Sequence, residues 1–248
     1  KLVHDRRQRR GRVGGARVRL TRTQHDEWER MRPHRLLAPL HNPWRLCILQ
    51  CGEEAPAVRV GIGGDREVGA ELPAVEEEVQ HDLVAAVDRV TTEWGGIDLF
   101  LNNARYVGPG HIDVLLDTPV DVIARHLQAN ILTPLEIIRR LLPGMIGQGG
   151  GTIIFVTSAS GYADPPARAG EGGWGLGYGV SKGGAHRIPG ILKAEHEKDG
   201  IRSFLVHPGL TATERFVQDM KAFGFEGGAP VDVIARVIGW LPTSSQAD

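Results

Sequence analysis

The stretch TIIFVTSASG, residues 152–161, decides the fold class of this chain. Its first half is apolar and β-branched and has no polar face, which is typical of a central strand in a parallel sheet that is covered on both sides. The sequence then changes to small hydroxyl residues and glycine, so a polar turn follows the strand. Ligands of open α/β sheets bind at the carboxyl ends of the strands. Ser158, in this turn, is therefore a candidate site residue.

Helices and strands alternate on both sides of this stretch. Apolar residues at helical spacing predict helices over residues 82–90, 120–142 and 178–197, and apolar runs predict strands over 97–101 and 201–206. The second helix contains Pro134, which is expected to kink it. This succession predicts the α/β class: a doubly wound parallel sheet of Rossmann type, in a single domain, with right-handed crossovers.

Tyr178 and Lys182 are the residues whose spacing suggests chemistry. They are four apart in a predicted helix and so share one face of it. A lysine ammonium beside a phenol favours the phenolate and lowers the tyrosine pKa from about 10. Such a tyrosine can act as a general acid or base near neutral pH. A surface tyrosine and lysine is the alternative interpretation, and on these two residues alone it is the more common case.

The motifs taken together resemble the short-chain dehydrogenase/reductase family over about residues 83–241. They are N-N-A as Asn102, Asn103 and Ala104, a helix asparagine as Asn130, a serine as Ser158, Y-x-x-x-K as Tyr178 and Lys182, and P-G-x-x-x-T as Pro208, Gly209 and Thr213. Each motif alone is weak, but five in the family's order are specific. The resemblance implies an enzyme, an oxidoreductase that transfers a hydride between NAD or NADP and a secondary alcohol or carbonyl substrate.

The resemblance also implies a role for each matched residue. Tyr178 would be the acid/base, Lys182 would lower its pKa and bind the cofactor ribose, and Ser158 would orient the substrate oxygen. Asn130 would support a proton relay, although an asparagine bonded to neighbouring backbone is an equal alternative. The cofactor would be bound by Asn102, Asn103, Ala104, Lys182, Pro208, Gly209 and Thr213. Thr213 also suits a helix N-cap, and Ser160 competes with Ser158.

Two residue patterns depart from the family. Arg105 stands where glycine usually follows N-N-A, which adds bulk and charge beside the cofactor. The interval from Ser158 to Tyr178 is long, and its insert, residues 164–177, is expected to overhang the substrate site and to shape specificity.

The family's glycine-rich phosphate loop is missing from the first part of the chain. The nearest imitation, residues 61–64, has the wrong spacing and is expected to be a plain turn. We therefore divide the chain into residues 1–67, an aberrant or irregular part of the expected cofactor-binding half, and residues 68–248, the catalytic portion of the single domain.

The missing motif, together with the arginine-rich run from Arg6 to Arg22, leaves three explanations open. In a GC-rich gene, a reading frame shifted by one base over His4 to Arg12 permits Thr-Gly-Ala-Ser-x-Gly-Val-Gly, the missing motif, and would also produce the arginine excess. A catalytically impaired protein without cofactor binding is the second explanation. A basic nucleic-acid-binding arm is the third, but the run has no interleaved aromatic residues, so a nucleic-acid partner is not expected.

Composition narrows the classes of protein to which the chain can belong. A net charge of -1 gives the whole chain no preference for polyanions. Cys47 and Cys51 are too few for a disulfide framework, and no second ligand pair follows them, so no metal is expected. No apolar run approaches the roughly 20 residues that span a bilayer, so we expect a cytoplasmic protein. The family resemblance implies a homodimer or homotetramer formed through residues 120–142 and 181–197.

Overall fold

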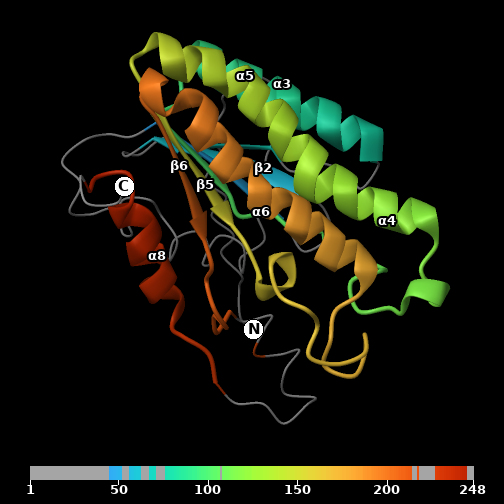
Figure 1. The fold of residues 1–248 in the computed structure, drawn as a ribbon. Helices are drawn as coiled ribbons and strands as arrows, with labels where there is room; N and C mark the ends of the chain where they lie inside the picture. Colours follow the sequence, from blue (N-terminus) through green and yellow to red (C-terminus); the bar gives the residue numbers. More distant parts are fainter. Residues whose placement is uncertain are drawn as a thin grey trace, which may run out of the picture.

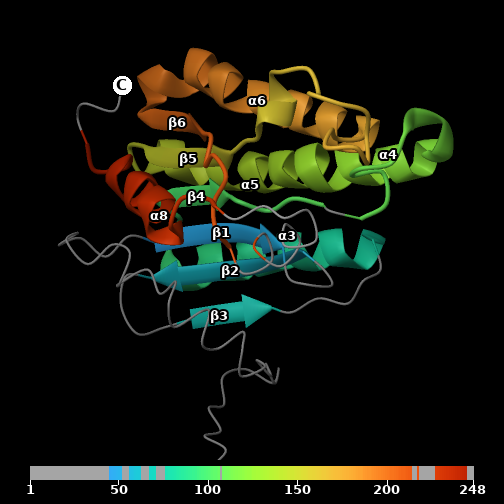
Figure 2. The same cartoon turned by 90° about the horizontal axis from the view of Figure 1, so that it is seen from below.

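The computed structural model describes residues 45–51, 56–62, 67–70, 76–106, 108–213, 217 and 227–244. The hypotheses about the arginine-rich run and the shifted reading frame lie outside these residues. Six strands form one sheet in the order β3-β2-β1-β4-β5-β6 (Figure 2). They are β1 (Arg45–Cys51), β2 (Pro56–Ile62), β3 (Glu67–Ala70), β4 (Leu99–Asn102), β5 (Gly151–Val156) and β6 (Ile201–Val206).

The sheet combines a parallel part with an antiparallel edge. Strands β1, β4, β5 and β6 run parallel, as the sequence predicted for the catalytic portion. Strands β2 and β3 pair antiparallel, so the prediction of a parallel sheet does not hold at this edge. The connections 52–55 and 63–66 are the reason, because a parallel pair needs a crossover of about a dozen residues or more.

These edge strands also correct the expectation of an irregular first part. Residues 45–51 and 56–62 are strands, and the boundary drawn after residue 67 falls inside β3. The glycine string at 61–64 begins at the end of β2, and the next described element is the strand β3. It therefore does not lead from a strand into a helix, as a phosphate-binding loop would.

Helices cover both faces of the sheet, which confirms the α/β prediction. One face carries α3 (Glu76–Trp94), α4 (Val120–Leu127), α5 (Thr133–Gly147) and α6 (Leu176–His196), and the other carries α8 (Val231–Trp240) (Figure 1). The short turns η1 (Leu115–Asp117), η3 (Ala159–Gly161) and η4 (Glu197–Asp199) join these elements. After α3 the chain turns at Gly95, whose φ of 73° is a left-handed conformation that favours glycine.

Strand β5 contributes side chains to the hydrophobic core on both faces of the sheet. Ile153 and Phe155 pack into the cluster beneath α3, α5 and α6, while Ile154 packs against residues of α8 on the other face. All three side chains are buried. Burying such a side chain contributes roughly 1.5–3 kcal/mol. The apolar run therefore stabilises both layers and fixes the position of the turn that follows it.

The helix predicted over residues 120–142 is interrupted. A π-helical turn, η2 (Gln128–Leu132), separates α4 from α5, and α5 continues to Gly147. Pro134, in the first turn of α5, explains the break, because it has no N–H for the carbonyl four residues earlier, at Asn130. The predicted kink is thus a wider helical turn, a feature that often occurs at functional sites.

Candidate active site

Three polar turns begin at adjacent strand ends. In the sheet register Asn102 of β4 pairs with Phe155 of β5, and Val156 pairs with Val206 of β6. The turns that start with Asn103, Thr157 and His207 therefore leave neighbouring strands at the same edge. Helix α6 begins beside this edge and carries Tyr178 and Lys182.

Tyr178 lies in the first turn of α6 with 7% of its surface exposed. Burial acts most strongly on its ionisation and opposes it. The Ser158 hydroxyl, the Lys182 ammonium and the Arg105 guanidinium act the other way and together outweigh burial. The pKa of Tyr178 is therefore lowered from its usual value of about 10.

Lys182 is buried one helical turn after Tyr178. Its Nζ donates a hydrogen bond of 3.2 Å to the carbonyl oxygen of Val156, the last residue of β5. Gly161 of η3 lies so close to α6 that a Cβ there would stand 2.9 Å from the Lys182 carbonyl oxygen. These contacts hold the turn after β5 against the helix that carries the tyrosine.

Ser158 and Ser160 lie in different surroundings within this turn. Ser158 caps η3 through a 3.4 Å bond that its Oγ accepts from the Ser160 N–H, and its hydroxyl is one of the groups that lower the pKa of Tyr178. The Ser160 hydroxyl is buried and has no hydrogen-bond partner in the described part of the chain. The contacts therefore support the choice of Ser158 over Ser160 as the site serine.

Asn130 occupies the π-helical turn and is 2% exposed. Its Nδ2 donates to the Ser181 hydroxyl at 2.9 Å, and its Oδ1 accepts from the Tyr106 N–H at 2.7 Å. Ser181 in turn donates to the Tyr178 carbonyl at 3.0 Å. Both alternatives weighed for Asn130 have some support, because it bonds to backbone and also connects the helix of Tyr178 to the segment after β4.

Two histidines of the site were missed by the sequence reasoning. The His111 ring meets the Tyr178 ring edge to face, with the ring centroids 4.4 Å apart. His126 of α4 is fully buried, and its Nε2–H donates to the Pro109 carbonyl at 2.9 Å. A Cβ on Gly177 would come within 2.6 Å of the His126 ring. Neither histidine belongs to a spaced motif, so the sequence contains no signal for them.

The residues expected to bind the cofactor lie along the same edge. Asn102 is buried, and its Oδ1 has no hydrogen-bond partner among the described residues, so it suits a donor from a bound molecule. Asn103 is exposed and Ala104 is buried beside it. Gly209 has a φ of 65°, and its N–H donates to His207 Nδ1 at 3.2 Å. Pro208 precedes it, and Thr213 is exposed four residues further on.

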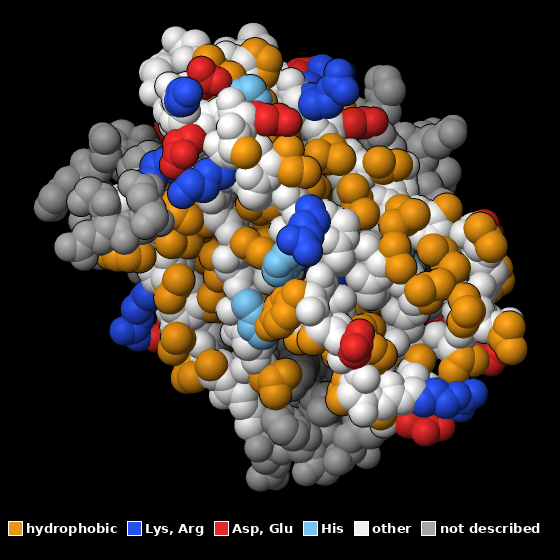
Figure 3. All heavy atoms as spheres, in the orientation of Figure 1, with side chains coloured by type: hydrophobic (Ala, Val, Ile, Leu, Met, Phe, Trp, Pro, Cys, Tyr) orange, Lys and Arg blue, Asp and Glu red, His pale blue; other side chains and the backbone are white. Residues whose placement is uncertain are grey.

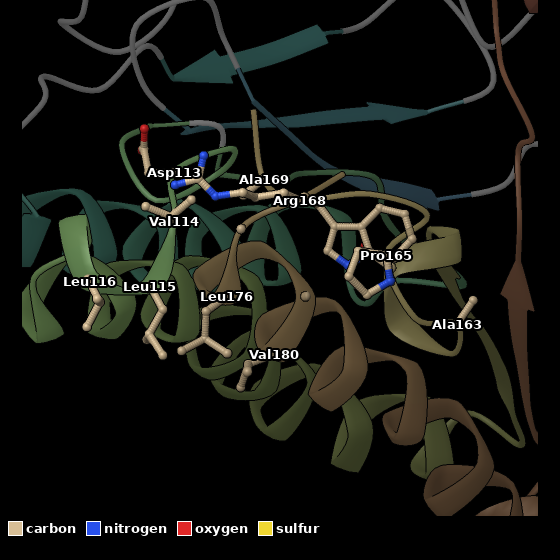
Figure 4. A pocket seen from close by; sticks show the side chains of 14 residues that line it. Asp113, Val114, Leu115, Leu116, Ala163, Pro165, Arg168, Ala169, Leu176 and Val180 are labelled. Atoms are coloured by element: carbon tan, nitrogen blue, oxygen red, sulfur yellow. The ribbon is translucent and has the colours of Figure 1, made fainter. Parts of the chain in front are cut away.

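A cavity of about 670 Å³ lies between η1, the insert and the first turns of α6 (Figure 4). Its wall is mostly apolar, and Asp113 and Arg168 are its charged side chains. Ser160 and Gly179 are among the residues that line the cavity, whereas Tyr178 is not one of them. The insert thus covers this cavity, and its effect on specificity stays a prediction.

The described ranges contain neither a candidate membrane span nor a candidate metal cluster. No helix there is both long and apolar enough to cross a bilayer. No three His, Cys, Asp or Glu side chains of these ranges are grouped so that they could hold a metal ion.

Comparison with known proteins identifies the class. The family model described as short chain dehydrogenase matches residues 60–222, which is well over half of the chain. The chain therefore belongs to the short-chain dehydrogenase family, as the sequence motifs predicted.

Individual relatives agree with this assignment. The chain is 29% identical over 132 residues to 2-(R)-hydroxypropyl-CoM dehydrogenase of Xanthobacter autotrophicus, a match that covers 53% of this chain and 50% of the relative. It is 28% identical to 7alpha-hydroxysteroid dehydrogenase of Paraclostridium sordellii, over 65% of this chain and 61% of that protein. The chain thus spans about half the length of the curated relatives it matches.

Solved structures share the fold. ElxO with NADP bound superposes with a TM-score of 0.57 at 17% identity and covers 71% of this chain and 72% of its own. A short chain dehydrogenase from Shigella flexneri gives 0.54 at 20% identity, over 68% of this chain and 63% of that one. At this identity the likeness concerns the fold, and it confirms the Rossmann-type architecture.

Proposed function

We propose that this protein is an NAD- or NADP-dependent oxidoreductase that interconverts a secondary alcohol and its carbonyl compound, with Tyr178 as acid/base. The observation that carries the proposal is the placement of Tyr178 on α6 one turn before the buried Lys182, where the pKa of Tyr178 is lowered because Ser158, Lys182 and Arg105 outweigh the effect of burial. A tyrosine in this state, at the ligand-binding edge of a short-chain dehydrogenase, is suited to proton transfer.

Each side chain of the site would have its own role in the proposed reaction. The substrate oxygen would lie between the Ser158 hydroxyl and the Tyr178 phenol, whose pKa that hydroxyl lowers. In carbonyl reduction Tyr178 gives its proton to the substrate oxygen, and in oxidation the phenolate takes the proton of the alcohol. Lys182 stabilises the phenolate, and Asn130 holds the helix in place through Ser181. The bound nicotinamide would supply or accept the hydride.

The cofactor would lie along the edge formed by the ends of β4, β5 and β6. The residues proposed to bind it are Asn102, Asn103, Ala104, Lys182, Pro208, Gly209 and Thr213. The buried Oδ1 of Asn102, which lacks a partner in the described ranges, supports this placement.

We also propose that the protein assembles as a homodimer or homotetramer. Figure 3 shows hydrophobic side chains gathered over α4 and the lower part of α6. Leu116 of η1 is 96% exposed, and Val120 at the start of α4 is 80% exposed. Val180 and Ile191 of α6 are also exposed. Apolar side chains that gather on a surface in this way mark protein interfaces.

The first test is a titration of the purified protein with NADH and NADPH, followed by nicotinamide fluorescence. Saturable binding that weakens in Lys182→Ala supports the proposal, and oxidation of secondary alcohols that is lost in Tyr178→Phe completes it. A folded protein that binds neither cofactor would contradict it. That result would favour the impaired alternative, which the glycine string at the end of β2 also favours because it leads to a strand.

A further inference from the structure

His126 is a buried side chain that joins two segments around Tyr178. We propose that His126 is a positioning residue of the active site, whose neutral imidazole fixes residues 108–113 against the first turn of α6. This packing keeps the His111 ring against the Tyr178 ring. The effect on catalysis rests on the proposed function, in which Tyr178 is the acid/base, whereas the placement of the two rings can be measured without turnover.

His126 ties residues 108–113 to α4 by a hydrogen bond and by close packing. Its Nε2–H donates to the Pro109 carbonyl oxygen at 2.9 Å. A Cβ on Gly110 would stand 3.3 Å from the same nitrogen. The Tyr106 ring, which precedes the segment, meets the imidazole edge to face with the ring centroids 4.8 Å apart. The imidazole is fully buried, so the segment rests on a side chain that solvent does not reach.

The same imidazole lies against the first turn of α6. A Cβ on Gly177 would come within 2.6 Å of the His126 ring, so a glycine is needed for this close approach. The segment and the helix also bond directly, because the Gly175 N–H donates to the His111 carbonyl oxygen at 2.8 Å. Tyr178 follows Gly177 and meets the His111 ring edge to face, with the centroids 4.4 Å apart. His126 therefore packs against both segments that bring these two rings together.

The contacts of His126 require the neutral imidazole. Its Nε2 carries the proton that Pro109 accepts, and its Nδ1 is buried with no hydrogen-bond partner among the described residues. A second proton, on Nδ1, would create a buried donor without an acceptor, which is unfavourable. Burial accordingly lowers the pKa of His126. Below that pKa the ring takes up the proton at the expense of its packing, so the contact between His111 and Tyr178 should loosen.

The ionisable groups around His126 come from two of the three elements packed there. The segment after β4 contributes the Tyr106 phenol and the Asp113 carboxylate, whose charge favours protonation of the imidazole. On α4 itself the neighbouring charges are Asp121 and Arg125, which are exposed and pair with each other at 3.5 Å. The first turn of α6 presents a glycine to the imidazole and so contributes no charge of its own.

The ring contact can be observed by NMR in protein labelled at histidine and tyrosine. The nuclear Overhauser effect between the His111 and Tyr178 rings reports it, and Tyr178→Phe identifies the signal. At pH 7.5 we expect the signal in the parent and in His126→Gln, whose amide keeps a neutral donor, and its loss in His126→Leu. At about pH 5 it should weaken in the parent more than in His126→Gln. Both proteins retain His111, which also titrates near neutral pH, so the difference belongs to His126.

His196→Gln is the matched control, because His196 lies in the last turn of the same helix and hydrogen-bonds to Asp199 at 2.9 Å. It should leave the signal as in the parent at both pH values. A signal of parental strength in folded His126→Leu would overturn the inference. If that variant does not fold, equal weakening of the parent and His126→Gln at the lower pH overturns it instead.

Kinetics separates this role from a purely structural one. If the protein is active, His126→Leu should lower kcat on the order of 10²-fold, the effect of a small misplacement of a reacting group, with the cofactor Kd unchanged. His126→Gln should recover most of that loss at pH 7.5. Loss of the NMR signal in a protein that oxidises no alcohol would leave the placement standing and contradict the proposed activity.

Discussion

At the scale of single residues, Ser158 and Ser160 offer the sharpest contrast in the site. The Ser158 hydroxyl lowers the pKa of the Tyr178 phenol, whereas the Ser160 hydroxyl is buried without a partner in the described ranges. We expect Ser158→Ala to lower kcat on the order of 10²-fold or more, the usual cost of removing one donor to a reacting oxygen. Steady-state kinetics with a secondary alcohol measures this loss.

Ser160→Ala is the matched control, because it removes the same group two residues away. It should leave kcat near that of the parent. It should not lower the urea midpoint, because removing a hydroxyl that has no partner abolishes no hydrogen bond. If the two variants lose activity equally, the assignment of Ser158 is wrong.

The residues of the site differ in how far a sequence can predict them. Tyr178 and Lys182 are fixed by helical spacing, and Ser158 by its place after a buried strand. The contact of His111 with Tyr178 joins segments that are distant in the chain, and no spacing rule describes it. Arg105 was visible in the sequence as a departure from the motif.

At the scale of elements, the Asn130 side chain of the π-helical turn connects α6 to the segment after β4. Asn130→Ala removes both hydrogen bonds, and we expect the free energy of unfolding to fall by about 1–3 kcal/mol. Urea unfolding measures the loss. An alanine variant as stable as the parent would contradict this role.

His126 makes the stability of the same region depend on pH. Burial lowers its pKa and outweighs the hydrogen bond to Pro109 and the charge of Asp113, which act in the opposite direction. The unfolded chain therefore binds a proton near pH 6.5 that the folded protein takes up only at lower pH. Stability should fall as the pH drops below about 6.5 towards the folded pKa.

The variant His126→Gln cannot take up this proton. The difference between its urea midpoints at pH 7.5 and pH 5 should be smaller than that of the parent, even though the variant is less stable at pH 7.5. An identical pH dependence in parent and variant would assign the acid sensitivity to other groups.

Elements differ in predictability for a physical reason. From α3 onward the apolar periodicity matches the helices and strands, because each packs one face against the sheet. The break at η2 was expected only as a kink, since a proline indicates where a helix is perturbed but not which turn results. Strands β1 and β2 belong to the first 67 residues, which are rich in arginine. The signal available there for β1 was the short run of apolar residues within RLCILQC.

At the scale of the whole molecule, the exposed apolar side chains of η1, α4 and α6 lead to a prediction about assembly. Stable interfaces bury roughly 800 Å² per partner, and a charge placed in their apolar centre is not compensated. We expect the parent protein to sediment as a dimer or tetramer and Val120→Glu to shift it towards the monomer. Analytical ultracentrifugation over a range of concentrations measures the shift.

Val237→Glu provides the matched control for this substitution. Val237 is 42% exposed on α8, which covers the opposite face of the sheet, so the same change of residue leaves the proposed interface intact. Because Val120 is itself 80% exposed, Val120→Glu should not disturb the monomer fold, and its far-UV circular dichroism should match that of the parent. A parent protein that is monomeric at every concentration would refute the interface. If Val120→Glu and Val237→Glu both dissociate the oligomer, the interface is not the one proposed, because Val237 lies on α8 at the opposite face of the sheet.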